Sequence, residues 1–523
     1  MPQLRDSGTR SLHATEPVPS AEMDGFCRIF GVETEYGVAV TGAERPVDAG
    51  QVAMTMFQPI VSRSRSTNTY LANGSRLYLD VGSHPEYATA EARDPREALA
   101  QDLAGEHVMR NLALKAQRKL RESYGAHATI HVFKNNVDSA GHAFGCHENY
   151  LVRRFVPLET IEHQLLPFLI TRQLYTGAGR MTPDGFQITQ RADFLDEAVS
   201  SATTRSRPMV NTRDEPHADP DSFRRLHVII GDSNRSQWST WMKLAVTHLV
   251  LCAIEDAFRH GVPSGFEQYA FADPAAANRT VSRFLDNPRA ELTLESGESV
   301  SALGLQRRYY AAVKAFIETH GDALAGSLPA TTIDTIMGEW SRVLDALERG
   351  AYDALADRVD WAAKKRLFDA LKRRRPDVTF AQMEQLELDY HDIANGRLYG
   401  SLVARNQMRE LLTGDNVEYA VHNPPTDTRA ALRGRFVDAA LNVGAQFSAD
   451  WTHLTLTAPE RREAHTPRSL RGRAHPGIRA AYGSVELVRN NTVGQHVTAP
   501  QQKDPDHLEL RPVCWTLLIR IQP

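Results

Sequence analysis

Alternating polar and apolar side chains in two short segments constrain the fold of this chain most strongly. Residues 76–81 read RLYLDV, so that Arg76, Tyr78 and Asp80 share one face and three aliphatic side chains share the other. Residues 27–40 combine apolar and β-branched side chains with two glutamates at alternate positions. Both patterns predict β-strands that bury one face and leave the other polar. We therefore expect a sheet with an apolar anchoring face and a polar working face.

Helical segments alternate with further strand-like segments along the chain. Apolar residues recur at helical spacing in residues 96–124 and 161–175, whereas residues 128–133 and 226–232 are typical of strands. From residue 333 to about residue 412 the pattern is mostly helical. This interleaving predicts an enzyme domain of the α+β or α/β class.

Breaks in this pattern divide the 523-residue chain into four predicted regions. Pro, Ser, Thr and charged residues dominate the N-terminus, and a cluster of helix-breaking residues, NPPTDT, begins at Asn423. After this cluster the pattern indicates a helix followed by a strand through Trp451, and beyond Pro459 it becomes rich in Arg, His and Pro. We expect a disordered extension over residues 1–25, a catalytic domain over 26–422, a small C-terminal domain over 423–459, and an atypical, disordered tail over 460–523.

The composition argues against binding to nucleic acid or to a membrane. Because 60 Lys and Arg stand against 64 Asp and Glu, the formal net charge is −4 and no overall field attracts phosphate groups. The N-terminus lacks the apolar core of a secretory signal, and the longest apolar run, residues 244–254, is shorter than the ~20 residues of a membrane-spanning helix. The four cysteines have no CxxC spacing, which fits a reducing compartment. We expect a cytoplasmic protein.

Glu33 and Glu35 lie two residues apart on one face of a predicted strand. Their mutual repulsion would raise the pKa of one carboxyl unless a cation lay between them, and carboxylate oxygens suit Mg²⁺. The same spacing is also typical of a solvated edge strand. The pair therefore suggests a metal site without establishing one.

Residues 73–87 are dense in side chains that carry chemistry. Arg76 suits a nucleotide phosphate, Glu86 suits a metal ion, and Asp80 suits the role of a general base. An ion pair between Asp80 and Arg76, which share a face, is the structural alternative, and His84 fits a turn.

Arginines farther along the chain offer a second source of positive charge. Arg205, Arg207 and Arg213 could brace the charge that develops during phosphoryl transfer, or could pair with neighbouring carboxylates in a buried network. Both interpretations stay open. The sequence contains no GxxxxGK[ST] motif, so a P-loop nucleotide site is not predicted.

Several blocks, in order along the chain, resemble the Pup ligase and Pup deamidase family. They include GVETEYG at residues 31–37, the run over residues 76–91, FKNNVDSAG at residues 133–141 and RRLHVIIGD at residues 224–232. The resemblance covers roughly residues 28–456. It implies a glutamine-synthetase-like α+β fold, in which a curved antiparallel sheet packs against helices and a small C-terminal domain follows.

Within this family the chain is more similar to the ligases. Only a short stretch separates Gly37 from Arg76, where the deamidases carry a long loop insertion. The resemblance implies that ATP phosphorylates the γ-carboxylate of the C-terminal glutamate of Pup, and that a lysine of a target protein then forms an isopeptide bond, which marks the target for proteasomal degradation. Pup deamidation is the main alternative. A small-molecule ligase of the glutamine synthetase type and a Pup-binding scaffold also stay open.

The resemblance assigns roles to individual residues as well. It implies ATP and Mg²⁺ as cofactors and makes Asp80 the proton acceptor, with Glu35 supporting the metal ion. Because a neutral phenol is a poor magnesium ligand, Tyr78 would act through a coordinated water. The implied magnesium-site residues are Glu33, Tyr78 and Glu86, and the implied nucleotide contacts are Arg76, Thr89 and Trp451.

Overall fold

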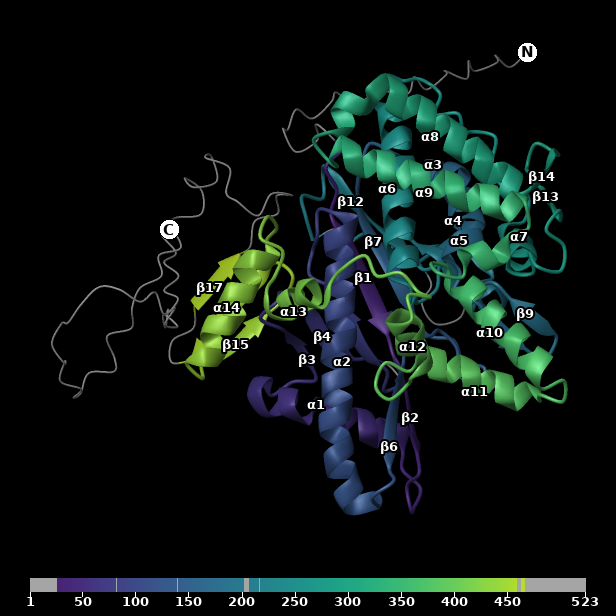
Figure 1. The fold of residues 1–523 in the computed structure, drawn as a ribbon. Helices are drawn as coiled ribbons and strands as arrows, with labels where there is room; N and C mark the ends of the chain where they lie inside the picture. Colours follow the sequence, from purple (N-terminus) through teal and green to yellow (C-terminus); the bar gives the residue numbers. More distant parts are fainter. Residues whose placement is uncertain are drawn as a thin grey trace, which may run out of the picture.

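An eight-stranded sheet forms the centre of the protein in this computed structural model (Figure 1). The structure describes residues 26–80, 82–138, 140–201, 207–215, 217–458 and 462–465. Neighbouring strands of the sheet are antiparallel, except for β10 and β11, which are parallel. In spatial order the strands are β10 (Glu197–Ser200), β11 (Pro208–Asn211), β12 (Phe223–Val228), β7 (Cys146–Arg153), β1 (Phe30–Glu35), β5 (Pro85–Ala88), β4 (Arg76–Leu79) and β3 (Asn68–Tyr70).

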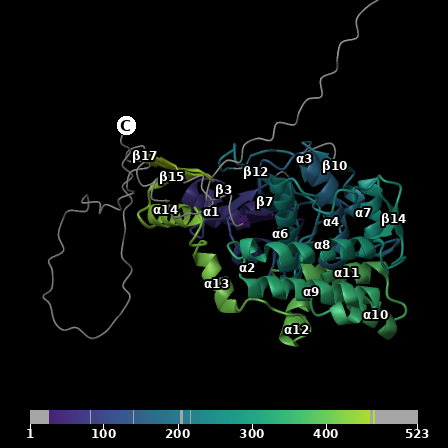
Figure 2. The same ribbon diagram turned by 90° about the horizontal axis from the view of Figure 1, so that it is seen from above.

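Two long helices, α2 (Pro95–Tyr124) and α6 (Gln237–His260), lie on the same side of this sheet (Figures 1 and 2). Asp94 begins the first helix and Ser236 the second, each by accepting hydrogen bonds from backbone amides of the first turn. The side chains of α6 are buried along nearly its whole length, because outer helices cover the side that faces away from the sheet. The main core therefore lies behind one face of the sheet.

The outer helices come from the middle of the chain. The single helix predicted over residues 161–175 is instead a π-helical turn, Ile161–Leu165, followed by two short helices, α4 and α5. The helices of this layer are α3 (Leu158–Thr160), α4 (Leu166–Thr171), α5 (Gln173–Thr176), α7 (Pro274–Ser282), α8 (Ala302–Leu324), α9 (Ala330–Glu348), α10 (Asp360–Arg374) and α11 (Phe380–His391). Two strand pairs accompany them: β8 (Arg180–Thr182) with β9 (Gly185–Gln187), and β13 (Glu291–Thr293) with β14 (Ser299–Ser301).

A second core lies at one end of α2. There β2 (Gly37–Thr41) pairs with β6 (Thr129–Phe133), and α1 (Ala49–Ser64) packs against α2. The apolar side chains of these elements form a separate cluster around Tyr36 and Ile130. This end of the molecule projects away from the outer helices (Figure 1).

The last described elements form a small unit beside β3 and β4. After α12 (Leu398–Ala404) and α13 (Gly414–His422), the helix α14 (Ala430–Asn442) leads into a three-stranded sheet. The strands are β15 (Gln446–Ala449), β16 (His453–Ala458) and β17 (Arg462–His465). Trp451 was expected within a strand, but it lies in the turn between β15 and β16, because the chain reverses there to pair these two strands.

The predicted α+β class, with a largely antiparallel sheet packed against helices, is confirmed. The division into four regions stays a prediction, and the expected N-terminal extension, residues 1–25, lies outside the described residues. Of the expected tail, only residues 462–465 are described. They form β17, so the structure differs there from the predicted disorder, because their backbone pairs with β16.

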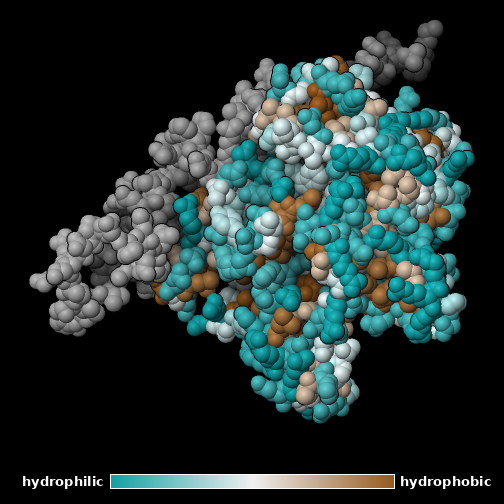
Figure 3. Space-filling view, in the orientation of Figure 1, coloured by the Kyte–Doolittle hydropathy of each residue, from teal (hydrophilic) through white to brown (hydrophobic). Residues whose placement is uncertain are grey.

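The surface carries no broad apolar band on the face shown in Figure 3, where hydrophobic residues form small, separate patches among hydrophilic ones. Among the described residues, no helix combines the length and the apolar character needed to cross a bilayer.

Candidate active site

The polar side chains predicted on separate strands meet on the face of the sheet opposite to α2. Because side chains alternate along β1, Thr34 points toward α2 and hydrogen-bonds to Asp102, whereas Glu33 and Glu35 point the other way. The register places Glu35 opposite Glu86 of β5, and Glu86 opposite Tyr78 of β4. The strand order β1-β5-β4 thus assembles the predicted metal-site residues.

Glu35, Asp80 and Glu86 form a cluster of three carboxylates, in which one oxygen from each residue lies within 4.8 Å of the others. Glu86 is buried, and burial together with the nearby Glu33 and Glu35 raises its pKa well above the usual value. The Tyr78 phenol hydrogen-bonds to Glu86. Burial and the surrounding carboxylates raise the pKa of Tyr78, so its proton stays in place.

A magnesium ion fits this donor set. Several carboxyl oxygens crowd one partly buried site, and a hard cation relieves their mutual repulsion. The alternative interpretation, an ion pair between Asp80 and Arg76, is not found among the described residues. Instead, the Arg76 guanidinium lies 4.1 Å from the centre of the Tyr78 ring, and its Nε donates to Asn68 Oδ1 at 2.9 Å.

A second group of polar side chains surrounds Glu33, on the side of β1 where β7 and β12 lie. His147 Nδ1 lies 3.3 Å from Glu33 Oε2, His227 Nε2 lies 3.7 Å from the same oxygen, and Arg225 lies 3.7 Å from Oε1. Burial alone would raise the pKa of Glu33, but the hydrogen bond from His147 and the neighbouring positive charge hold it well below the usual value.

His227 approaches Glu33 at ion-pair distance, but neither of its ring nitrogens makes a hydrogen bond within the described part of the chain, although the ring is largely buried. Burial and the adjacent His147 lower the pKa of His227 to about 3, so the ring is neutral near pH 7 and keeps a free lone pair. Donor atoms of Glu33, His147 and His227 lie within 4.8 Å of one another, which is a spacing that can hold a metal ion.

The sequence did not single out these histidines. His227 lies within residues 226–232, a segment typical of a strand, and no metal-ligand spacing in the sequence links it to His147. Their relation to Glu33 depends on the order β1-β7-β12 and on the pairing of Glu33 with His147, which the local pattern does not encode.

The predicted nucleotide contacts Thr89 and Trp451 line one hollow in front of β1. Thr89 accepts a hydrogen bond from the Val32 amide at 3.0 Å, which fixes it beside the strand. Glu33 and Arg225 also line this hollow, so it borders the group of possible metal ligands around Glu33. Arg76 lies on β4, outside the lining, and the structure therefore does not bring it to the same hollow.

The arginines predicted farther along the chain do not form one cluster among the described residues. Arg205 lies outside the described residues. Arg207 donates to the Ala143 carbonyl at 2.6 Å, in the loop that leads to His147. Asp214, one of the carboxylates next to these arginines in the sequence, pairs with Arg154 at 2.5 Å.

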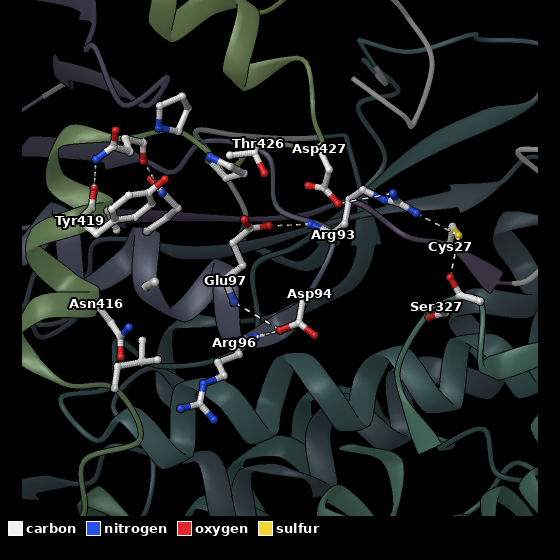
Figure 4. Close-up of a pocket in the computed structure, with 18 residues that line it drawn as sticks. Cys27, Arg93, Asp94, Arg96, Glu97, Ser327, Asn416, Tyr419, Thr426 and Asp427 are labelled. Carbon is white, nitrogen blue, oxygen red and sulfur yellow. Dashed lines mark hydrogen bonds and ion pairs between the residues drawn. The ribbon is translucent and has the colours of Figure 1, made fainter. Parts of the chain in front are cut away.

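A larger hollow of about 720 Å³ lies between the start of α2, α13 and the loop over residues 423–428 (Figure 4). It contains none of the predicted site residues. One ion pair lies within it: Arg93 contacts Asp427 at 3.4 Å and also donates to the Cys27 sulfur at 3.2 Å. Its size alone does not make it the reaction site.

Comparison with known proteins places residues 28–455 in the family model described as "Pup-ligase protein". The chain is 98% identical over 464 residues to the Pup–protein ligase of Bifidobacterium longum strain DJO10A, which covers 89% of this chain and 96% of the relative. Identity to the Pup–protein ligase of Bifidobacterium dentium is 64% over 465 residues, covering 88% of this chain and 95% of the relative.

Two solved structures share this fold. The crystal structure of the complex between Pup and its ligase PafA matches with a TM-score of 0.77 at 33% identity, over 92% of this chain and 100% of the other. The structure of the Pup ligase PafA with ADP matches with a TM-score of 0.68 at 36% identity, over 81% of this chain and 93% of the other.

Proposed function

This chain belongs to the Pup-ligase family, and from this membership we infer that it is a Pup–protein ligase that uses ATP to join Pup to lysine side chains of target proteins. The single observation that carries this inference is the extent of the match. It spans the polar face of the sheet and the unit that bears Trp451, so it includes every predicted site residue.

The reaction has two steps. A γ-carboxylate oxygen of the C-terminal glutamate of Pup attacks the γ-phosphorus of ATP, which gives an acyl phosphate and ADP. A lysine amine of the target then attacks the acyl carbon, phosphate leaves, and the amine loses a proton. Asp80 is the group proposed to accept this proton, because forming the C–N bond makes the amine proton far more acidic than that of a free ammonium.

Magnesium is the proposed second cofactor. Glu33 and Glu86 would hold it directly and Tyr78 through a water, while Glu35 supports the same carboxylate group. When bound, the ion neutralises charge on the transferring phosphoryl group. Crowding of Glu35, Asp80 and Glu86 supports a cation at Glu86, and the effect of the nearby Glu33 on the pKa of Glu86 supports Glu33 as a further ligand.

The nucleotide is proposed to lie in the hollow in front of β1. Thr89 and Trp451 line it, and an indole face suits stacking of a base. Arg76 is proposed to contact a phosphate group of the nucleotide on the side of the site where the Glu35, Asp80 and Glu86 carboxylates lie. Its guanidinium has no acidic partner among the described residues, which supports this role.

The proposed partners are Pup and lysine-bearing target proteins in the cytoplasm. The near balance of 60 basic and 64 acidic residues supports the absence of nucleic acid among them.

The function is tested by mixing the protein with Pup ending in glutamate, ATP, Mg²⁺ and a lysine-bearing acceptor. Mass spectrometry should detect an isopeptide-linked conjugate, formed with one ADP per bond. Hydrolysis of a C-terminal glutamine of Pup without matching ADP release would instead support the deamidase, and ATP turnover with free glutamate and an amine, without Pup, would support a small-molecule ligase.

A further inference from the structure

We propose that Arg433 is a positioning residue that holds Trp451 at the nucleotide hollow through a buried ion pair with Glu91. This inference rests on the proposed function, because it gives Trp451 the role of a nucleotide contact. It names two residues, Glu91 and Arg433, that take part in binding ATP without touching the reacting atoms.

The ion pair joins two distant parts of the chain. Glu91 follows β5 by three residues and also lines the hollow, and two arginines of the C-terminal unit enclose its carboxylate. Arg429 Nε lies 2.6 Å from Oε1, and Arg433 donates through both terminal nitrogens. Burial alone would raise the pKa of Glu91, but these guanidinium groups lower it to about 2, so the carboxylate is charged near pH 7.

Arg433 makes the contacts of a fixed side chain rather than of a solvated one. Its exposed fraction is 0%, and it donates to the Gly74 carbonyl through Nε at 2.9 Å and Nη2 at 2.7 Å. Gly74 lies in the turn between β3 and β4. The guanidinium therefore bridges Glu91 and this turn, and its planar fork matches both acceptors.

The same guanidinium supports Trp451. Its central carbon lies 4.8 Å from the centre of the indole ring, and Nη1 donates to the Trp451 carbonyl at 3.3 Å. Tyr70 packs edge-on to the indole, with ring centres 5.1 Å apart at 89°. The electron-rich face of an indole attracts a cation, and burial strengthens this attraction.

Thr89 and Trp451 are thereby tied to one carboxylate. Thr89 lies two residues before Glu91, and Trp451 reaches Glu91 through Arg433. Because Arg433 links Trp451 to Glu91, loosening this ion pair should move the indole away from the base. Phosphate transfer itself should not change once ATP is bound.

The test is a double-mutant cycle, in which Arg433→Met and Trp451→Leu are made singly and together. Arg433→Met should raise KM for ATP about tenfold, the equivalent of 1.4 kcal/mol, while kcat at saturating ATP and KM for Pup stay within about twofold. In the Trp451→Leu background, Arg433→Met should add little, because the ring it positions is gone. Independent, additive effects on KM for ATP would overturn the proposal.

Three further variants keep the result interpretable. Arg435→Met changes an exposed arginine of the same helix and should leave KM for ATP unchanged. Arg433→Lys keeps a positive charge beside Glu91 and should fold if Arg433→Met does not; a normal KM for ATP in this folded variant would refute the need for the planar fork. If Trp451→Leu alone leaves KM unchanged, the proposed nucleotide contact fails, and the proposal with it.

Discussion

At the scale of single residues, Asp80 is where the chemistry of the site can be separated from binding. It belongs to the group with Glu35 and Glu86 and forms no ion pair with Arg76 among the described residues. Asp80→Asn keeps the shape but removes the base, so conjugate formation should fall about 10²- to 10⁴-fold. ATP affinity, measured by calorimetry, should change by less than about threefold. Conjugation at the unmodified rate would exclude Asp80 as the proton acceptor.

Glu97, in the hollow of Figure 4, makes stability depend on pH. Burial and the neighbouring Asp427 raise its pKa from 4.5 to about 7. The folded protein therefore binds a proton more tightly than the unfolded chain, and this group's contribution to stability is lost as the pH rises from about 4.5 through 7. At 1.36 kcal/mol for each pKa unit, the upper limit is about 3 kcal/mol.

Glu97→Gln should therefore raise the free energy of unfolding at pH 8 more than at pH 5. Urea denaturation at both values measures this difference. Glu122→Gln, at an exposed position of the same helix, serves as the control and should show no such dependence. An equal effect of Glu97→Gln at the two pH values would contradict the pKa assignment.

The residues that could be predicted from the sequence are those whose neighbours are close in the chain. Glu35, Asp80 and Glu86 stood out by spacing or by the density of the run around them, and one oxygen of each lies within 4.8 Å of the others. Glu91 and Arg433 did not, because an ion pair between residues 342 positions apart leaves no local pattern. The roles assigned to Arg76 and Thr89 still rest on the resemblance and stay predictions.

At the scale of elements, α14 packs closely against the neighbouring turn because Gly434 has no side chain. A methyl group at Gly434 would overlap the Ala72 carbonyl oxygen and approach Pro424 Cγ to 2.9 Å. The helix packs there against the turn that precedes β4. Gly434→Ala should therefore push α14 away from this turn, lower stability by about 1–3 kcal/mol and raise KM for ATP.

Thermal unfolding and ATP titration check this prediction. Gly400→Ala is the matched control, because a methyl group at this position of α12 meets nothing within 4 Å and alanine favours a helix. A fully active, equally stable Gly434→Ala variant would mean that the close approach does not seat the helix.

Elements with a strong local period were predicted well. The helix expected over residues 96–124 is α2, Pro95–Tyr124, and the strand expected over 128–133 is β6, Thr129–Phe133. The turn at Trp451 was wrongly expected to be a strand. Its conformation follows from the pairing of β15 with β16 and from Asp450, which accepts from the Thr452 and His453 amides.

At the scale of the whole molecule, the class of fold followed from the sequence, but the strand order did not. The order β10-β11-β12-β7-β1-β5-β4-β3 joins segments far apart in the chain, and one residue of slip would turn Glu33 and Glu35 toward α2. Periodicity shows which face of a strand is polar. It does not show which strand lies beside it.

Two truncations test where the working molecule ends. A variant that stops at residue 465 keeps every described element, whereas one that stops at residue 459 lacks β17, which pairs with β16. The longer variant should bind ATP as the full chain does, and the shorter should melt at a lower temperature and bind ATP more weakly. Identical melting and ATP affinity would mean that β17 adds nothing to the fold.

The distance along the chain between Glu91 and Arg433 also has a consequence for how the protein is made. A ribosome that adds about 5–20 residues each second needs roughly 20 to 70 s to pass from one to the other. During that interval the carboxylate that will anchor the indole has been synthesised, but its arginines have not. The nascent chain therefore lacks its platform for the nucleotide base until nearly all the described residues have emerged, and a truncated product of early termination lacks it altogether.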